Sequence, residues 1–459
     1  MSEEKFDIAI IGAGPGGYVA AIKAAQTGKK VALVDKSHLG GTCLNVGCIP
    51  TKTLLSNATL YHKMKMAKEY GIHTGELSVD YGQMKSRKDA VVQKLRGGIE
   101  GLLKANKVKF FSGHAKFVSL KEIKVGEETL IRFEKAIIAT GSEPVDIPAF
   151  PCDHKQILNS TSILELTEIP KTLVVVGGGY IGCEFASLFA ELGTKVTIVE
   201  ALPKIVMAQG DQISKVLHDA LEKRGIEILT DTMVESIDSG LKINLKGGKT
   251  LEAEKALISV GRRVVSENLG LDRAGVAVNK VGMIEVNEKM ETNSPGIYAI
   301  GDVTGIAMLA HIASHQGIVA AVNATGGSAQ MHYHAIPAVI FTTPEIAMVG
   351  MTLEEAKKEG YAAKTGQFPF QALGKSQASL DTEGFAQIVI DEKTGQILGA
   401  QVVGHEASAL IGEMAIAIQN ELTTDCVIDT IHPHPTITEG WLEAALLANN
   451  TPIHLPPKR

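Results

Sequence analysis

The feature that most constrains the fold is a dinucleotide-binding fingerprint near the start of the chain. An apolar stretch at residues 6–11 is followed by a glycine-rich turn, an alanine-rich segment and a second apolar stretch that finishes at Asp35. The turn has the form Gly-x-Gly-x-x-Gly, with its glycines at Gly12, Gly14 and Gly17. In a strand–turn–helix–strand unit, such glycines let the backbone approach a pyrophosphate, and the acid receives the ribose hydroxyls. The first fingerprint therefore predicts a bound dinucleotide.

The same pattern occurs a second time in the chain. An apolar stretch at residues 173–176 runs into a second glycine-rich turn, a helical segment and a strand that finishes at Glu200. The glycines of this second fingerprint are Gly177, Gly179 and Gly182. A carboxylate at this strand end hydrogen-bonds a free ribose 2′-hydroxyl and repels a 2′-phosphate, which predicts NAD rather than NADP. The alternative is that Glu200 is an ordinary exposed acid at the end of a strand.

The two fingerprints together predict an α/β fold with two nested Rossmann-like dinucleotide-binding domains and a C-terminal α+β domain. We expect the first domain to comprise residues 1–147 and 270–336, the second residues 148–269, and the third residues 337–459. Within the third domain, the pattern predicts two strands and then two helices, at residues 387–390, 398–403, 408–420 and 439–448. Two dinucleotides in one chain indicate redox chemistry between them.

Two cysteines lie shortly after the first fingerprint, in the segment Gly40-Gly41-Thr42-Cys43-Leu44-Asn45-Val46-Gly47-Cys48. In a regular helix the Cα atoms of residues i and i+5 are roughly 8.7 Å apart, whereas a disulfide requires less than about 7 Å. The pair can therefore close only where the helix is distorted, and Gly47 is the residue best able to permit this. A zinc site would need two further ligands at matching spacing, and the other cysteines occur singly. The pattern predicts a redox pair and no metal site.

Composition limits the partners and the setting that we expect for this chain. Its 459 residues are 45% hydrophobic and 21% charged, as in soluble globular proteins. The net charge of −6 opposes binding to nucleic acid or to an acidic membrane surface. The sequence has no apolar run near the roughly 20 residues that span a bilayer. An acidic start without a signal peptide, together with an odd number of cysteines, favours a cytoplasmic location.

A candidate base lies near the C-terminal end, in the segment His432-Pro433-His434-Pro435-Thr436-Ile437-Thr438-Glu439. Prolines on both sides of His434 restrict its backbone. Glu439 is close enough in sequence to bind one imidazole nitrogen and to raise the basicity of the other. A dithiol substrate needs such a base, because a free thiol with a pKa of about 8.5 is mostly protonated at neutral pH. A proline-ordered loop with solvated histidines explains the spacing equally well.

These motifs resemble those of a known family. The Gly-Gly-Thr-Cys-Leu-Asn-Val-Gly-Cys-Ile-Pro segment, both fingerprints, the Ala-Thr-Gly and Gly-Asp elements and the His-Pro-Thr-x-x-Glu ending occur in the family's order. The chain resembles the FAD-dependent pyridine nucleotide–disulfide oxidoreductases over essentially its whole length. The resemblance implies FAD at the first fingerprint and NAD at the second. It also implies a homodimer formed through the third domain, with the base presented to the cysteine pair of the other subunit.

The resemblance assigns roles to the cysteines and to the histidine. Cys43 is implied as the thiol that exchanges with substrate, and Cys48 as the thiol that faces the flavin. His434 is implied as the base, with Glu439 as its orienting partner.

Further contacts are implied around the cofactors. Lys52 is implied near flavin N5, paired with Glu184, which follows the second fingerprint. Asp302 is implied at the ribityl chain of FAD. The other implied contacts are Thr140 and Gly141 for FAD and Gly261 for NAD.

Within the family, the chain most resembles members that use NAD⁺ to reoxidise dihydrolipoyl groups in 2-oxo acid dehydrogenase and glycine-cleavage complexes. The implied partner is a lipoyl-bearing acyltransferase or a glycine-cleavage carrier protein. Mercuric reductases and large thioredoxin reductases are expected to carry a C-terminal cysteine pair, whereas the last cysteine here is Cys426. Glutathione reductases are expected to use NADPH, which Glu200 opposes. The chain departs from the family at Val264-Val265, where relatives commonly have Pro-Asn.

Overall fold

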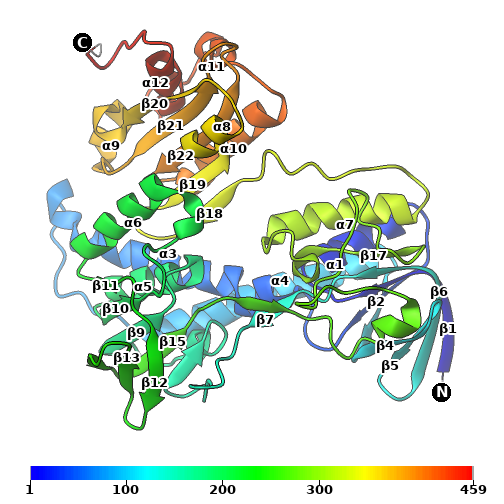
Figure 1. The fold of residues 1–459 in the computed structure, drawn as a ribbon. Helices are drawn as coiled ribbons and strands as arrows, with labels where there is room; N and C mark the ends of the chain where they lie inside the picture. The colour runs from blue at the N-terminus through cyan, green and yellow to red at the C-terminus, as the bar shows by residue number, and fades with distance from the viewer. Residues whose placement is uncertain (1, 457–459) are drawn as a thin grey trace. The chain divides into compact units, whose positions relative to one another are not determined.

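The computed structural model describes residues 2–456 and divides into two compact units, which are described one at a time (Figure 1). The first unit consists of Met1–Pro170, Ser236–Ile243 and Glu252–His332. The second unit consists of Lys171–Glu235, Asn244–Leu251 and Tyr333–Arg459.

The first unit contains a seven-stranded sheet in the order β3-β2-β1-β6-β5-β4, with β17 pairing to β6. The pairs among β3, β2, β1, β6 and β17 are parallel, and β4 and β5 add an antiparallel edge. A parallel sheet is covered on both faces, which explains the continuous apolar runs in β1 and β2. The strand bounds are β1 Ser2–Ile11, β2 Val31–Asp35, β3 Lys109–Ser112, β4 Ala115–Ser119, β5 Glu122–Val125, β6 Thr129–Ile138 and β17 Ile297–Ala299.

Two helices of the first unit pack together through glycines. These are α1 (Pro15–Ala25), which starts at the first fingerprint, and α7 (Ala310–Ala324). A Cβ atom at Gly317 would lie 2.5 Å from the carbonyl oxygen of Gly16, so the close approach requires glycine. The other helices are α2 Gly41–Val46, α3 Cys48–Lys65, η1 Ala67–Tyr70, α4 Tyr81–Ala105, η2 Ser162–Glu165, η4 Leu271–Ala274 and η5 Gly301–Thr304.

Short strand pairs complete the first unit. β7 (Ser142–Pro144) pairs antiparallel with β16 (Arg262–Val264), and β8 (Ile157–Asn159) pairs parallel with β15 (Lys255–Ile258). The chain passes between the two units within three further strands, which are β12 Val234–Asp238, β13 Lys242–Leu245 and β14 Thr250–Glu252.

The second unit begins with the strands of the second fingerprint. β9 (Thr172–Val176), β10 (Lys195–Val199) and β11 (Glu227–Leu229) are parallel and lie in the order β11-β10-β9. The helices of this region are α5 Tyr180–Glu191, η3 Met207–Gln209 and α6 Asp211–Lys223.

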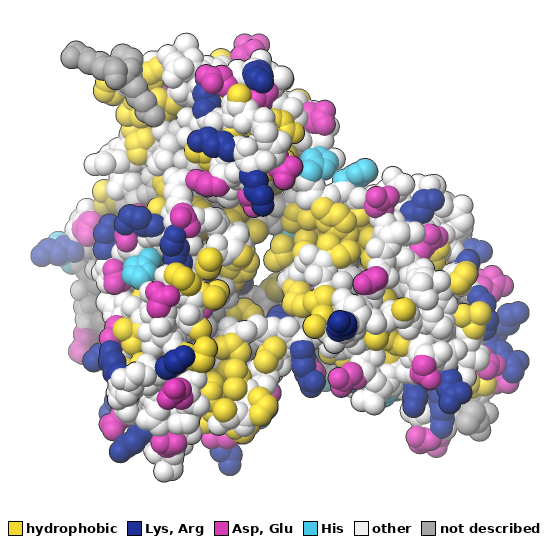
Figure 2. Space-filling view, viewed as in Figure 1, with side chains coloured by type: hydrophobic (Ala, Val, Ile, Leu, Met, Phe, Trp, Pro, Cys, Tyr) yellow, Lys and Arg dark blue, Asp and Glu magenta, His cyan; other side chains and the backbone are white. Residues whose placement is uncertain are grey.

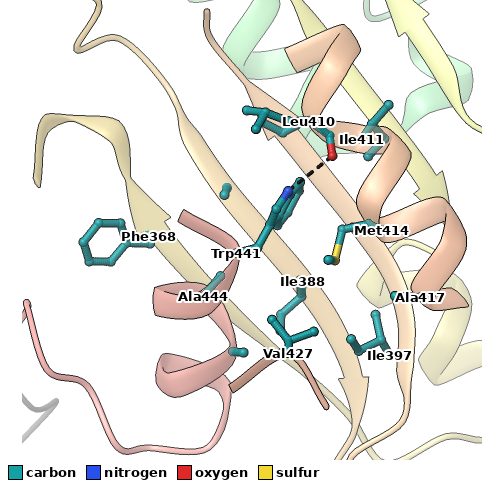
Figure 3. Close-up of a cluster of buried hydrophobic side chains, with 14 of the residues drawn as sticks. Phe368, Ile388, Ile397, Leu410, Ile411, Met414, Ala417, Val427, Trp441 and Ala444 are labelled. Atoms are coloured by element: carbon teal, nitrogen blue, oxygen red, sulfur yellow. Dashed lines mark hydrogen bonds between the residues drawn. The ribbon is translucent and has the colours of Figure 1, made fainter. Parts of the chain in front are cut away.

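The rest of the second unit is an antiparallel sheet in the order β18-β19-β22-β21-β20, with its own helices. Its core is built around Trp441, which is 1% exposed and donates its indole N–H to the carbonyl oxygen of Leu410 at 3.3 Å (Figure 3). The bounds are β18 Ala338–Ile340, β19 Ile346–Gly350, α8 Leu353–Lys358, β20 Ala363–Pro369, η6 Phe370–Ala372, α9 Gly374–Ser379, β21 Phe385–Asp391, β22 Ile397–Val403, α10 Ala407–Gln419, α11 Thr424–Asp429 and α12 Glu439–Ala448.

The α/β class and the duplicated nucleotide-binding pattern expected from the sequence are confirmed. The limits of the three expected domains stay a prediction, and residues 457–459 of the third lie outside the described residues. Within residues 2–456, the structure holds no helix that is long and apolar enough to cross a membrane. Lysine, arginine and acidic side chains are interspersed on the visible face of each unit, rather than gathered by sign (Figure 2).

Candidate active site

The two cysteines lie on either side of a break between two helices. α2 ends at Val46 and α3 begins at Cys48, and Gly47 between them has φ −145° and ψ −112°. A Cβ atom at Gly47 would lie 2.9 Å from the carbonyl oxygen of Thr42 and 3.3 Å from the Cα atom of Cys43. The helix is therefore interrupted at the glycine, as the spacing predicted, and the cysteines approach across the break.

The thiols of Cys43 and Cys48 are unlinked in this structure and interact directly. The hydrogen bond with the Cys48 side chain and burial raise the pKa of the Cys43 thiol far above its usual range. The backbone N–H of Cys48 and the positive charge of Lys52 act in the opposite direction but do not prevail. The contact with Cys48 and burial therefore both favour the protonated thiol of Cys43.

In the first fingerprint, the carboxylate of Asp35 is held by backbone N–H groups. Asp35 Oδ2 accepts the N–H of Ala13 at 2.6 Å, and Oδ1 accepts the N–H of Ser37 at 2.7 Å. Gly17 serves packing, because a Cβ atom there would lie 1.8 Å from the carbonyl oxygen of Gly12. Gly14, the N-cap residue of α1, is different, since a Cβ atom there would have its nearest neighbour at 3.9 Å. The helix N-terminus is thus open to a ligand.

The second fingerprint repeats this arrangement. Glu200 Oε2 accepts the N–H of Gly178 at 2.6 Å, and Oε1 accepts the N–H of Leu202 at 2.7 Å. Gly179 is the N-cap residue of α5, and a Cβ atom there would meet no heavy atom of the described residues within 4 Å. Glu200 is therefore fixed in place at an open helix N-terminus, which is more than an ordinary exposed acid at the end of a strand would require.

The Ala-Thr-Gly element is held by backbone atoms of Val265, in the Val264-Val265 segment where the chain differs from its relatives. Thr140 Oγ1 donates to the carbonyl oxygen of Val265 at 2.5 Å, and the N–H of Val265 donates to the carbonyl oxygen of Gly141 at 2.9 Å. Gly141 has φ +73° and Gly261 has φ +131°, both in the region that favours glycine. Both contacts use backbone atoms of Val265. The valine side chains at positions 264 and 265 therefore do not prevent these two hydrogen bonds.

Asp302 belongs to a partly buried polar cluster that the sequence did not indicate. It lies in η5, and its Oδ2 accepts the hydroxyl of Ser142 at 2.5 Å. Arg262 donates from Nε to Ser142 Oγ at 2.7 Å and from Nη2 to the Ser142 carbonyl oxygen at 2.8 Å. Burial lowers the pKa of Arg262, while the charges of Asp302, Cys48 and Glu143 raise it. The sequence analysis missed Ser142 and Arg262. Their only signal in the sequence is that each directly follows a motif glycine, Gly141 or Gly261.

His434 and Glu439 meet as the sequence suggested. His434 Nδ1 lies 2.8 Å from Glu439 Oε1, and Glu439 Oε2 accepts the N–H of Thr436 at 2.8 Å. Burial alone would raise the pKa of Glu439, but the hydrogen bonds from His434 and Thr436 outweigh it and hold the pKa below its ordinary value. An ionised Glu439 requires Nδ1 to donate, so the neutral imidazole presents Nε2 as its basic atom. The His434 side chain is 76% exposed, which leaves it accessible to a partner.

Lys52 and Glu184 fall in different units. Lys52 lies on α3, one turn after Cys48. Glu184 lies on α5, is 6% exposed, and accepts the backbone N–H of Phe341 at 3.1 Å. Their pairing stays a prediction, as does the meeting of His434 with the cysteines, because the structure describes each residue within its own unit.

Comparison with protein families matches nearly the whole chain. Residues 6–317 match the model described as pyridine nucleotide-disulphide oxidoreductase. Residues 336–445 match the dimerisation domain of the same family.

Individual relatives agree with the family match. The dihydrolipoyl dehydrogenase of Chlamydia muridarum is 48% identical, with 99% of each chain covered, and that of Geobacillus stearothermophilus is 43% identical, with 98% of this chain and 97% of that one covered. Among solved structures, LpdA of Mycobacterium tuberculosis has a TM-score of 0.91 at 27% identity, over 97% of this chain and 99% of that chain. The flavoprotein disulfide reductase RclA of Escherichia coli has a TM-score of 0.87 at 29% identity, over the same shares of the two chains.

Proposed function

This chain belongs to the pyridine nucleotide–disulphide oxidoreductase family, and we propose that Cys43 and Cys48 carry its reaction. The enzyme is an NAD-dependent oxidoreductase that reoxidises dihydrolipoyl groups, with FAD and NAD as cofactors. The observation that carries the residue assignment is the direct contact of two thiols across the helix break at Gly47.

The residues at the two fingerprints fit the dinucleotides. At Gly14 and Gly179 a helix N-terminus begins at an open glycine, which suits a pyrophosphate. The carboxylates of Asp35 and Glu200 are held by backbone N–H groups beside these turns, which suits ribose hydroxyls. When bound, FAD and NAD⁺ supply two-electron acceptance, with a hydride passing to NAD⁺.

We propose that the thiol chemistry proceeds by two exchanges. His434 Nε2 removes a proton from one substrate thiol, and the thiolate attacks Cys43 Sγ of the oxidised pair. The Cys43–Cys48 bond breaks, and Cys48 leaves as a thiolate. The second substrate thiol then displaces Cys43, which closes the lipoyl disulfide and returns a thiol at Cys43. The substrate is oxidised by two electrons and the enzyme disulfide is reduced by two.

Charge near Cys48 supports its role as the leaving thiolate. The cation of Arg262 lies within electrostatic range of Cys48, and Lys52 follows Cys48 by one helical turn. A nearby positive charge favours a thiolate over a thiol. Asp302, Thr140, Gly141 and Gly261 are proposed as further cofactor contacts.

The chain carries the dimerisation domain of its family, which indicates a homodimer. We propose that His434 of one subunit serves Cys43 of the other and that Lys52 pairs with Glu184. The substrate would be a lipoyl group on an acyltransferase or on a glycine-cleavage carrier protein. We also propose a cytoplasmic location, because a disulfide in a reducing compartment is usually catalytic rather than structural.

The first test of this function is a steady-state assay with two substrate pairs. Dihydrolipoamide with NAD⁺ should be turned over far faster than glutathione disulfide with NADPH. The reverse preference would refute the proposed substrate.

The second test addresses the subunit arrangement. Cys43→Ser and His434→Gln should each be inactive alone, and subunit exchange between them should restore activity through one intact site. No recovery despite demonstrated exchange would place both residues in the site of one subunit.

A further inference from the structure

The two helices that carry the cysteines differ in how strongly they are held. α3 has 18 residues and begins with Cys48, whereas α2 has 6 residues and carries Cys43. A helix this short makes few internal hydrogen bonds, so its position depends on contacts from outside. Both helices pack against α4, which runs beside α3 in Figure 1.

One arginine of α4 contacts the middle of α2. Arg96 donates to Asn45 Oδ1 from both Nε, at 3.0 Å, and Nη2, at 2.6 Å. Asn45 lies two residues after Cys43 and three before Cys48. Two donors converging on one oxygen fix the amide plane of Asn45 and tie α2 to a helix of 25 residues.

The other half of the Asn45 amide points to the segment before α2. Its Nδ2 donates to the carbonyl oxygens of Leu39, at 3.0 Å, and Gly41, at 2.8 Å. That segment touches the first fingerprint, because the N–H of Gly40 donates to the carbonyl oxygen of Ala13 at 2.8 Å. Every hydrogen-bonding direction of the amide is therefore used, between α4 on one side and the dinucleotide turn on the other.

A second arginine of α4 contacts α3 in a similar way. Arg87 Nη1 donates to Asn57 Oδ1 at 3.0 Å and to the carbonyl oxygen of Thr53 at 3.3 Å. Asn57 lies more than two turns beyond Cys48 in a continuous helix. Arg87 therefore holds a helix that is already rigid, whereas Arg96 holds one that is not.

We propose that Arg96 and Asn45 form a clamp that fixes α2 and thereby sets the distance between Cys43 and Cys48. Arg96 is a positioning residue that acts through Asn45 on the redox couple. The proposal rests on the proposed function only in taking these cysteines as the redox pair.

The clamp should affect the couple through the effective concentration of the thiols. A fixed α2 holds Cys43 against Cys48, which favours the disulfide over the dithiol. Without the clamp, Cys43 samples positions away from Cys48, so the equilibrium moves toward the dithiol. The same freedom should expose Cys43 and remove its hydrogen bond with Cys48.

The test uses the holoenzyme equilibrated without oxygen in dithiothreitol buffers of known oxidised fraction. The exchange consumes one reduced dithiothreitol per enzyme disulfide and forms its cyclic disulfide. Thiol trapping and the mass of the peptide containing both cysteines give the dithiol-to-disulfide ratio. Arg96→Met and Asn45→Ala should each raise this ratio by at least about threefold, where tenfold corresponds to about 30 mV. Both should also speed alkylation of Cys43 in the reduced enzyme.

Arg87→Met is the matched control, because it removes the same kind of contact from the same helix. Its dithiol-to-disulfide ratio should equal that of the wild type. Arg96→Met should add nothing in an Asn45→Ala background, since the clamp is already absent. Arg96→Lys keeps the charge and one donor, so it should fall between wild type and Arg96→Met and serves if the methionine variant does not fold.

An unchanged ratio in Arg96→Met or Arg96→Lys would overturn the proposal. An equal shift in Arg87→Met would overturn it too, by showing a general loosening of α4. Failure of the proposed function is distinguishable, because it appears as absent dihydrolipoamide turnover in the wild type, whatever the ratios of the variants.

Discussion

The two fingerprints hold acids of different length with the same hydrogen bonds. Asp35 and Glu200 each accept one N–H from the second residue of the turn and one from the residue two positions after the acid, at 2.6 and 2.7 Å in both cases. The longer side chain of Glu200 thus reaches the same backbone donors as the shorter Asp35. In both fingerprints the backbone of the turn therefore fixes the acid. What is duplicated in the chain is this backbone arrangement, and the length of the acidic side chain is free to differ.

The supports behind the two fingerprints are different. α1 is backed by α7 at glycine distance, with Gly317 against Gly16. α5 is instead backed by polar contacts, in which Glu184 accepts the N–H of Phe341 and Ser187 accepts the N–H of Thr343, both at 3.1 Å. A larger residue at the contact between α1 and α7 should therefore lower the stability of the first fingerprint.

The largest expected effect comes from replacing His434, which should impair the thiol reaction but not the hydride transfer between the cofactors of the two fingerprints. His434→Gln should lower dihydrolipoamide oxidation by about 10²–10⁴-fold, because a general base is lost. Oxidation of NADH by an artificial flavin oxidant should stay near the wild-type rate, since it needs no thiol base. His454→Gln is the matched control, because His454 also binds a glutamate, Glu443, through Nδ1 at 2.7 Å. Equal losses in both reactions would contradict the assignment.

The second effect tests the difference between two glycine positions of the fingerprints, the tightly packed Gly17 of the first and the open N-cap Gly179 of the second. Gly17→Ala should lower the free energy of unfolding by about 3 kcal/mol, because its Cβ atom would lie 1.8 Å from a carbonyl oxygen. Gly179→Ala should unfold like the wild type while binding NAD⁺ more weakly, because its Cβ atom enters open space. Urea unfolding followed by circular dichroism checks the first and NAD⁺ titration the second. Similar stabilities for the two variants would erase the distinction.

A smaller effect concerns cofactor choice. Glu200→Ala should shift the ratio of kcat/KM for NAD⁺ over NADP⁺ by about 1–3 kcal/mol toward NADP⁺, because a charged acceptor for the ribose is lost. Asp35→Ala should weaken retention of FAD and leave that ratio unchanged. Kinetics with both cofactors on both variants decide this, and an unchanged ratio in Glu200→Ala would locate discrimination at other residues.

The smallest effect extends the comparison to a third acid, Glu439. Because folding lowers its pKa below the ordinary value of 4.5, its ionised form adds stability at pH above 4.5. That contribution should disappear as the pH falls through the lower folded pKa. The wild type should exceed Glu439→Gln by less than about 1 kcal/mol at pH 7, since the pair is partly exposed. Urea unfolding from pH 7 to 3 should show the difference shrinking, and a difference that grows on acidification would contradict the argument.

The features that could be predicted from the sequence are local ones. The turn of each fingerprint, the helix break at Gly47 and the contact of His434 with Glu439 each involve residues close in the chain. The helix expected at residues 408–420 is confirmed as α10, with a shift of one residue at each end. Short-range patterns of glycine, proline and apolar residues determine such features.

Contacts between distant segments could not be predicted in this way. The hydroxyl of Ser142 meets Asp302 across 160 residues, and Arg96 meets Asn45 across 51. These contacts depend on which strands and helices become neighbours, and no periodicity in the sequence encodes that. The domain limits likewise stay a prediction.

The buried Trp441 allows unfolding of the C-terminal region to be followed separately by fluorescence. It is the only tryptophan in the chain, and it lies on α12 in the core of the antiparallel C-terminal region. Its emission should report the solvation of that region alone, whereas circular dichroism averages over all helices and strands. Coincident transitions of the two signals in urea would indicate that the chain unfolds as one cooperative system. Separate transitions would resolve the order in which its parts lose their structure.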